Sequence, residues 1–229
     1  MRQPSSRCVL LRHDVDRNPS NAIAMAELEH ALGIRSTYYV RKVTSAYSDA
    51  LVSKLHALGH EVGYHYEVLS KTGGDMHAAL TLFAAELKEL RHLAPICTAS
   101  SHGSPLSPWD SLDIWKHSNP TDFGLLGEAY LQIDYSKVAY YTDTGRTWSN
   151  DGINLRDRVD SGASEQPGAR TTDELLDLIS TRQLKTVCIQ THPERWNSRA
   201  VGQFRSVLFD WSANCAKRVI RAVRSNHVR

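Results

Sequence analysis

Short β-rich runs alternate with longer helical runs along most of this sequence, and this alternation limits the fold more than any other feature. The predicted strands are residues 8–11, 36–40, 60–66, 96–100 and 185–190, with further strand-like runs at 131–135 and 138–141. The predicted helices are residues 19–32, 48–58, 75–90 and 171–179, with another helix start near 107. Such alternation is typical of parallel βα units, which form either an open doubly wound sheet or a barrel.

A polar, chemically capable cluster follows four of the predicted strands. The clusters are His13-Asp14-Val15-Asp16, Tyr64-His65-Tyr66-Glu67, Ser101-His102-Gly103 and Thr191-His192-Pro193-Glu194. A barrel gathers the carboxyl ends of its strands around one mouth, where its chemistry is normally housed. An open sheet would spread the clusters along an edge and leave distant members unable to cooperate. We therefore predict an α/β barrel.

Composition and charge narrow the class of protein. The 229 residues are 41% hydrophobic and 23% charged, as in globular proteins, and a net charge of +2 gives no sign of nucleic-acid binding. No apolar run approaches the ~20 residues of a transmembrane segment. Residues 1–7 lack the apolar stretch of a signal peptide. We expect a cytoplasmic protein with one catalytic domain over residues 1–229, including a basic C-terminal helix at about 200–226.

Asp14 and Asp16 form the first candidate pair for chemistry. Residues two apart on an extended backbone point to the same face, so the two carboxylates project side by side at the end of a strand. Such closely spaced like charges resist joint ionisation unless a cation lies between them or one is protonated. The pair therefore suits a division of roles, with Asp16 binding a metal ion and Asp14 acting as a base. The alternative is that Asp16 or Asn18 only caps the next helix.

Three histidines, His65, His102 and His192, fall in the other polar clusters. A single histidine is more often a surface or core residue than a ligand, but three at corresponding strand ends favour a shared site. Neutral imidazole and carboxylate together suit a divalent metal, with Zn²⁺ the expected ion. Such a metal lowers the pKa of bound water towards ~7 and polarises a carbonyl group.

The order of these clusters resembles that of the NodB-homology polysaccharide deacetylases, carbohydrate esterase family 4. The matching motifs are Arg12-His13-Asp14-Val15-Asp16, Gly59-His60-Glu61-Val62-Gly63-Tyr64-His65, Ser101-His102-Gly103-Ser104-Pro105 and Gln190-Thr191-His192-Pro193. The resemblance covers roughly residues 9–196. It implies a distorted (β/α)7 TIM-like barrel, a divalent metal and hydrolytic removal of an acyl group from an amino sugar.

The resemblance also implies roles for individual residues. It makes Asp14 the general base that activates water, and Asp16 and His65 metal ligands. His192 matches the late-strand histidine that protonates the leaving amine.

Two departures from the family pattern concern the metal ligands. The family usually has a second histidine four residues after the first, and Leu69 stands at that position. The fourth-strand motif normally has an arginine ahead of its proline, where this chain has His102. We predict that His102 is the third metal ligand, with Glu67 as the other candidate. If neither reaches the metal, the alternative is an altered barrel that only binds glycan or scaffolds partner enzymes.

The sequence resembles most a subgroup of deacetylases associated with bacterial surface-polysaccharide and O-antigen (lipopolysaccharide) biosynthesis. This resemblance implies an amino-sugar substrate that is nucleotide-linked or lipid-linked. The residues predicted to bind that substrate are Tyr64, Glu67, Asp143, Arg146 and Trp148. The last three could instead form a structural ion pair with a packing tryptophan. The basic C-terminal helix is either a solvated face or a peripheral contact with an acidic membrane surface.

Overall fold

The computed structural model describes residues 7–104, 107–148, 159, 167–181 and 184–197, together with residues 202, 204, 206–208 and 211. Within these residues the chain forms one seven-stranded sheet in the order β5-β4-β3-β2-β1-β7-β6, and every neighbouring pair is parallel. The strands are β1 (Cys8–Val15), β2 (Thr37–Arg41), β3 (Glu61–Tyr66), β4 (Thr98–Ser101), β5 (Gly127–Glu128), β6 (Ala139–Thr142) and β7 (Thr186–Thr191).

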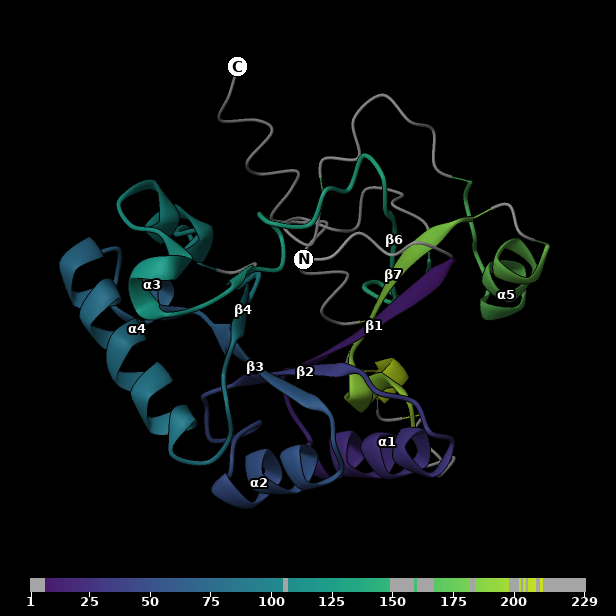
Figure 1. Ribbon diagram of the computed structural model, residues 1–229, viewed down its shortest axis with the longest axis horizontal. Helices are drawn as coiled ribbons and strands as arrows, with labels where there is room; N and C mark the ends of the chain where they lie inside the picture. Colours follow the sequence, from purple (N-terminus) through teal and green to yellow (C-terminus); the bar gives the residue numbers. More distant parts are fainter. Residues whose placement is uncertain are drawn as a thin grey trace.

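The sheet curls, and its edge strands β5 and β6 do not pair with each other in the described part of the chain (Figure 1). The result is a distorted, open (β/α)7 barrel, which confirms the predicted fold class. Because all the strands run in one direction, the residues that follow them gather at one end of the barrel.

The helices lie along the outside of the curved sheet, with α1, α2 and α4 following one another around an arc and α5 beside β6 and β7 (Figure 1). Their bounds are α1 (Pro19–Ala31), α2 (Asp49–Ala57), α3 (Val68–Lys71), α4 (Met76–Arg91) and α5 (Thr172–Ser180), with the 3-10 helices η1 (Ser111–Lys116), η2 (Pro120–Phe123) and η3 (Pro193–Arg195). Three of the described α-helices begin with a side-chain cap, in which Ser48, Asp75 and Thr171 accept a hydrogen bond from a backbone N–H of the first turn.

The main hydrophobic core lies between strands β1–β4 and helices α1, α2 and α4. Its large buried side chains include Tyr38, Leu55, Tyr64 and Phe83. These residues sit at alternate positions on the strands or on one face of their helices, so the sheet presents its other face to the barrel interior.

The strand predicted at residues 131–135 is wrong. The buried Glu128 carboxylate accepts the backbone N–H groups of Tyr130 and Leu131 at 2.7 and 3.1 Å, and that of Ser101 at 2.8 Å. A side chain thus takes hydrogen bonds that a strand ladder would need, and the chain turns after the short strand β5.

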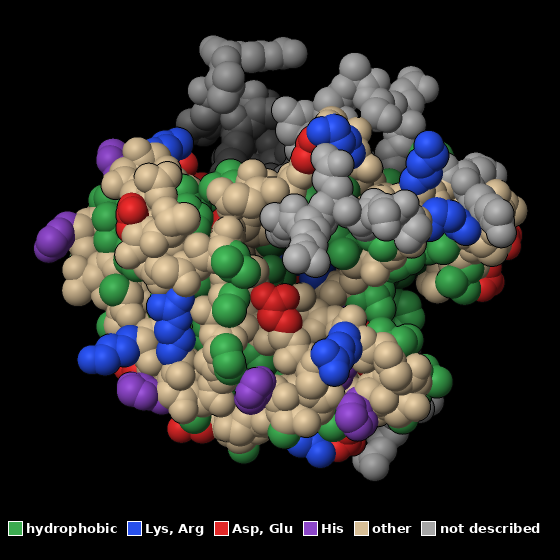
Figure 2. Space-filling model, viewed as in Figure 1, with side chains coloured by type: hydrophobic (Ala, Val, Ile, Leu, Met, Phe, Trp, Pro, Cys, Tyr) green, Lys and Arg blue, Asp and Glu red, His purple; other side chains and the backbone are tan. Residues whose placement is uncertain are grey.

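No helix in the described part of the chain is long and apolar enough to cross a membrane. Of the predicted C-terminal helix, residues 202, 204, 206–208 and 211 are helical, and its basic residues lie outside the described residues. On the face drawn in Figure 2, basic, acidic and hydrophobic side chains are interspersed, and neither charge gathers into a continuous patch over the described surface.

Candidate active site

Five of the predicted residues meet at the carboxyl ends of β1, β3, β4 and β7. Asp14 lies at the end of β1, Asp16 follows it, and His65 lies in β3, while His102 and His192 come directly after β4 and β7. The Asp16 carboxylate is the centre of the group. Its Oδ1 lies 3.3 Å from His65 Nε2, and its Oδ2 lies 3.6 Å from His102 Nε2 and 3.9 Å from His192 Nε2.

Hydrogen bonds fix which nitrogen of His65 and His102 faces Asp16. His65 Nδ1 lies 2.9 Å from the Ser100 carbonyl oxygen, which can only accept, so Nδ1 carries the hydrogen. His102 Nδ1 lies 3.2 Å from the Glu67 carboxylate and 2.9 Å from the Ser104 hydroxyl. With the hydrogen on Nδ1, Nε2 is the atom of each ring that could act as a ligand on the Asp16 side, and a bond of this kind to the other nitrogen is typical of metal-binding histidine. Burial lowers the pKa of His102, but Asp16 and Glu67 outweigh it and raise the pKa to about 9, so a cation at Nε2 would replace a proton.

These residues fit a divalent cation. Asp16 Oδ1 is buried, and no described residue donates a hydrogen bond to it. A carboxylate with one unsatisfied oxygen, with His65 Nε2 beside that oxygen and His102 Nε2 beside the other, is a donor set that suits Zn²⁺ or a similar ion. Among the described residues, no three His, Cys, Asp or Glu side chains are already arranged as a complete metal centre.

Glu67 lies behind His102 and not beside Asp16. Arg41 Nη2 donates to its Oε2 at 2.5 Å, and the same oxygen faces His102 Nδ1. Burial raises the pKa of Glu67, but the bonds from His102 and Arg41 outweigh it and hold the pKa at about 2. Of the two predicted candidates for the third ligand, the geometry supports His102, with Glu67 orienting its ring.

Asp14 is held by two groups that sequence reasoning missed. Arg12 Nη2 donates to both carboxylate oxygens at 3.0 and 2.8 Å, and Gln190 Nε2 donates to Oδ2. Burial raises the pKa of Asp14, yet the Arg12 charge and the nearby histidines lower it below its usual value. Asp14 is therefore ionised at neutral pH and ready to accept a proton.

The sequence carries a signal for Arg12, whereas the Gln190 contact follows only from the register of the strands. Arg12 stands two residues before Asp14, so the two side chains share a face of β1. Gln190 is the register partner of Arg12 on β7. Arg12 also donates to the Ser100 hydroxyl on β4 at 2.6 Å, which places its guanidinium inside the barrel.

His192 is oriented by Asp143, whose carboxylate lies 2.6 Å from Nδ1 and also accepts the His192 backbone N–H at 3.1 Å. Burial and the neighbouring Arg195 lower the pKa of His192, but Asp143 and Asp16 outweigh them and raise it to about 9. The ring therefore carries a proton at neutral pH. Asp143 was predicted to bind substrate, and the structure instead gives it first the task of positioning His192.

Glu194 is a further acidic group that sequence reasoning left without a role. It is buried, its Oε1 lies 3.8 Å from Arg17 Nε, and no described residue hydrogen-bonds to its Oε2. Burial and the Asp16 charge raise its pKa to about 7. Asp16 therefore has another buried acidic group, Glu194, near it in addition to the three histidines.

Tyr64 is a correction to the predicted substrate-binding set. Strand side chains alternate, so Tyr64 points away from His65, and its fully buried ring packs on Phe83 while its hydroxyl donates to Glu86 on α4. It does not reach the barrel mouth. Leu69, which replaces the family's second histidine, is likewise buried in the main core.

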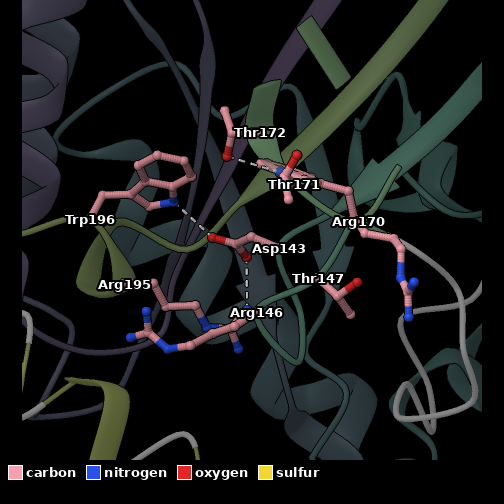
Figure 3. Close-up of a pocket in the computed structure, with 9 residues that line it drawn as sticks. Asp143, Arg146, Thr147, Arg170, Thr171, Thr172, Arg195 and Trp196 are labelled. Atoms are coloured by element: carbon pink, nitrogen blue, oxygen red, sulfur yellow. Dashed lines mark hydrogen bonds and ion pairs between the residues drawn. The ribbon is translucent and has the colours of Figure 1, made fainter. Parts of the chain in front are cut away.

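The remaining predicted substrate residues, Asp143, Arg146 and Trp148, line a cavity of about 270 Å³ beside His192. The other described lining residues are Thr147, Arg170, Thr171, Thr172, Arg195 and Trp196. Figure 3 shows Asp143 at the centre, with Trp196 on one side and the Arg146 and Arg195 side chains below it. Trp196 Nε1 and Arg195 Nη1 donate to the Asp143 carboxylate at 2.9 and 2.8 Å.

No family model and no curated protein matches this sequence. Solved structures match its fold. The catalytic domain of peptidoglycan N-acetylglucosamine deacetylase from Eubacterium rectale matches with a TM-score of 0.53 at 10% identity, over 92% of this chain and 87% of that chain. The peptidoglycan deacetylase PdaC from Bacillus subtilis matches with a TM-score of 0.51 at 11% identity, over 97% of this chain and 96% of that chain. The chain therefore has the NodB-homology fold of carbohydrate esterase family 4.

Proposed function

We propose that this protein is a metal-dependent hydrolase that removes an N-acyl group, acetyl or formyl, from an amino sugar during bacterial surface-polysaccharide biosynthesis. The observation that carries the proposal is the convergence of Asp14, Asp16, His65, His102 and His192 at one end of the barrel. The fold supports it, because two proteins with the same fold are named as deacetylases of peptidoglycan.

Asp16, His65 and His102 would hold the metal ion. When bound, a divalent cation supplies Lewis-acid polarisation of the amide carbonyl and lowers the pKa of water. Asp14 accepts the proton of the attacking water, since Arg12 and Gln190 keep its carboxylate ionised and fix its orientation.

His192 supplies the second proton transfer. Asp143 accepts the Nδ1 hydrogen, so Nε2 is the atom that points towards Asp16 and carries the proton for the leaving amine nitrogen. The carbon–nitrogen bond breaks as that nitrogen takes up the proton, and the products are a carboxylic acid and a free amino sugar. At neutral pH Asp14 is deprotonated and can accept a proton, and His192 is protonated and can donate one. Amide hydrolysis at neutral pH requires both of these protonation states.

Metal analysis of protein purified without chelator tests the proposal. We expect about one divalent ion per chain, lost in His65→Ala and in Asp16→Asn, and kept in the control His77→Ala, which alters an exposed histidine of α4. Acyl release from N-acetylated and N-formylated amino sugars should follow the metal. Metal-free protein under every loading condition would contradict the proposal and favour the alternative, a barrel that only binds glycan or scaffolds partners.

A further inference from the structure

We propose that Glu194 is a further protein ligand of the divalent ion at Asp16. This inference rests on the proposed function, because that function includes the metal ion, and it adds a second carboxylate to the metal site. Glu194 lies in η3, two residues after His192, so it comes to the barrel mouth from the carboxyl end of β7.

The Glu194 carboxylate is buried with one oxygen that lacks a hydrogen bond. The residue is 1% exposed, and no described residue forms a hydrogen bond with its Oε2. The other oxygen, Oε1, lies 3.8 Å from Arg17 Nε, which is too long for a hydrogen bond. Burial of a carboxylate oxygen without a partner costs free energy, so such an oxygen in a folded protein indicates a water, an ion or a functional role.

The backbone of Glu194 is held by side chains around it. Asn197 Nδ2 and Ser206 Oγ each donate to the Glu194 carbonyl oxygen at 2.9 Å. Asn21 Nδ2, in α1, donates to the Pro193 carbonyl oxygen at 3.3 Å, and η3 lies beside α1 in Figure 1. These bonds fix the place from which the Glu194 side chain extends, and a metal ligand needs such support from its surroundings.

Glu194 and Asp16 lie on neighbouring segments at the barrel mouth. Arg17, which directly follows Asp16, faces Glu194 Oε1. His192, two residues before Glu194, places its Nε2 3.9 Å from Asp16 Oδ2. Burial is the largest cause of the raised pKa of Glu194, and the Asp16 charge is the next. Asp16 Oδ1 and Glu194 Oε2 are both buried oxygens that no described residue bonds, and two such oxygens on carboxylates that repel each other suit a shared cation.

The charges at the barrel mouth agree with a second carboxylate ligand. Asp14 is paired with Arg12 at 2.8 Å, so its charge is matched within β1. Asp16 and Glu194, when both are ionised, carry a charge equal and opposite to that of one divalent ion. Carboxylate oxygens and the two histidine nitrogens are ligand types that first-row divalent ions accept together.

Titration of the metal-stripped full chain with Zn²⁺, in competition with a chelator, tests the proposal. Glu194→Gln keeps the size of the side chain and should weaken Zn²⁺ binding on the order of 100-fold, since even residues that only orient ligands contribute up to that much. Glu27→Gln removes an exposed carboxylate of α1 and is the matched control, so its Zn²⁺ affinity should equal that of the wild type.

Arg17→Gln separates metal binding from a structural ion pair. This variant removes a positive charge near the ion, so it should bind Zn²⁺ at least as tightly as the wild type. Equal weakening in Arg17→Gln and Glu194→Gln would show that Glu194 serves only to pair with Arg17, and would overturn the proposal. An unchanged Zn²⁺ affinity in Glu194→Gln would also overturn it.

Melting temperatures measured with and without Zn²⁺ separate a lost ligand from a damaged fold. Without metal, Glu194→Gln should melt no earlier than the wild type, because the substitution removes a buried charge. At one Zn²⁺ concentration, the rise in melting temperature should be smaller in the variant than in the wild type, because a ligand stabilises the folded chain according to its affinity. An equal rise in both would overturn the proposal.

The wild type alone gives a test that holds even if Glu194→Gln does not fold. Anomalous diffraction from crystals loaded with Zn²⁺ locates the ion. A Glu194 carboxylate oxygen within ~2.0–2.2 Å of it supports the proposal, and no Glu194 oxygen in that range overturns it. A wild type that binds Zn²⁺ without Glu194 leaves the proposed function standing, whereas a wild type that binds no metal overturns both.

Discussion

Two buried histidine–carboxylate networks in the described part of the chain differ in how completely their hydrogen-bonding groups are paired. On the outer face of the sheet, the Glu29 carboxylate forms hydrogen bonds with three groups. They are His13 Nε2 at 2.9 Å, the Ser36 hydroxyl at 2.6 Å and the Tyr38 hydroxyl at 2.8 Å. At the barrel mouth, Asp16 stands among three histidines with one oxygen that no described residue bonds. In the outer network the carboxylate oxygens are hydrogen-bonded within the protein. In the inner network one carboxylate oxygen is left for a ligand.

The comparison shows that residue type alone does not separate structure from function. His13 is the direct sequence neighbour of Asp14, yet alternation along β1 sends it to the outer face. The outer network should therefore affect the free energy of unfolding, and the inner one should affect turnover.

The largest expected effect is that of His192→Gln. If His192 is the proton donor, as proposed, its loss should lower kcat by about 10²–10⁴-fold, which corresponds to ~3–5 kcal/mol of transition-state stabilisation. The melting temperature should change by no more than a few degrees, because Asp143 keeps its bonds from Arg195 and Trp196. Steady-state kinetics and calorimetry on the same preparation measure both quantities. A variant that melts early but turns over normally would reverse the assignment of the two networks.

Glu29→Gln should produce the opposite pattern. Removing the charge from a buried pair costs about 3 kcal/mol of unfolding free energy, which lowers the melting temperature by roughly 6–12 °C in a chain of this size. Urea denaturation gives the free energy, and kcat should stay within about twofold of the wild-type value. A large loss of kcat in folded Glu29→Gln would show that the outer network also serves catalysis.

Asp143→Asn should lower kcat on the order of 10²-fold and shift its pH dependence. Asp143 and Asp16 raise the pKa of His192 to about 9, so the wild-type acid stays protonated until the pH passes that value. Without the Asp143 charge the pKa of His192 should fall towards ~6.5. The pH above which activity declines should then move down by the same amount. The kcat–pH profile measures the shift, and an unchanged alkaline limit would contradict the positioning role.

The smallest expected effect is the acid sensitivity that Glu29 contributes. Burial raises its pKa, but His13, Ser36 and Tyr38 lower it from 4.5 to about 2. A lowered folded-state pKa gives stability that is fully present above pH ~4.5 and is lost as the pH falls through ~2. By pH 3 the loss should be about 2 kcal/mol, seen as a shrinking difference between wild type and Glu29→Gln in denaturation at each pH. A difference in unfolding free energy between wild type and Glu29→Gln that stays constant from pH 7 to pH 3 would contradict a lowered pKa of Glu29.

Sequence reasoning succeeded where the chemistry depends on strand ends. Periodicity and punctuation predicted the main strands, and the parallel topology then brought Asp14, Asp16, His65, His102 and His192 together. It failed where function depends on contacts across the barrel. Nothing local indicates that Gln190 donates to Asp14, because that contact requires the register of β1 and β7.

Two other errors have definite physical causes. Tyr64 belongs to the same polar cluster as His65, which favours a place in the substrate site, but adjacent strand residues point to opposite faces. The strand predicted at 131–135 was assigned from its residue types, and a single buried carboxylate, Glu128, redirects the backbone there. Long-range hydrogen bonds of this kind are set by tertiary structure and leave little trace in local pattern.

The ion pair between Arg12 and Asp14 lies within one strand, and this has a mechanical consequence. Asp14, the proposed base, and its counter-charge Arg12 are separated by a single residue of β1 in the centre of the sheet. The contact between the proposed base and its counter-charge therefore needs only the strand itself, and it does not depend on the conformation of any loop at the barrel mouth. Loop changes that leave His102 in place should alter which ligand enters while the Asp14 carboxylate stays ionised.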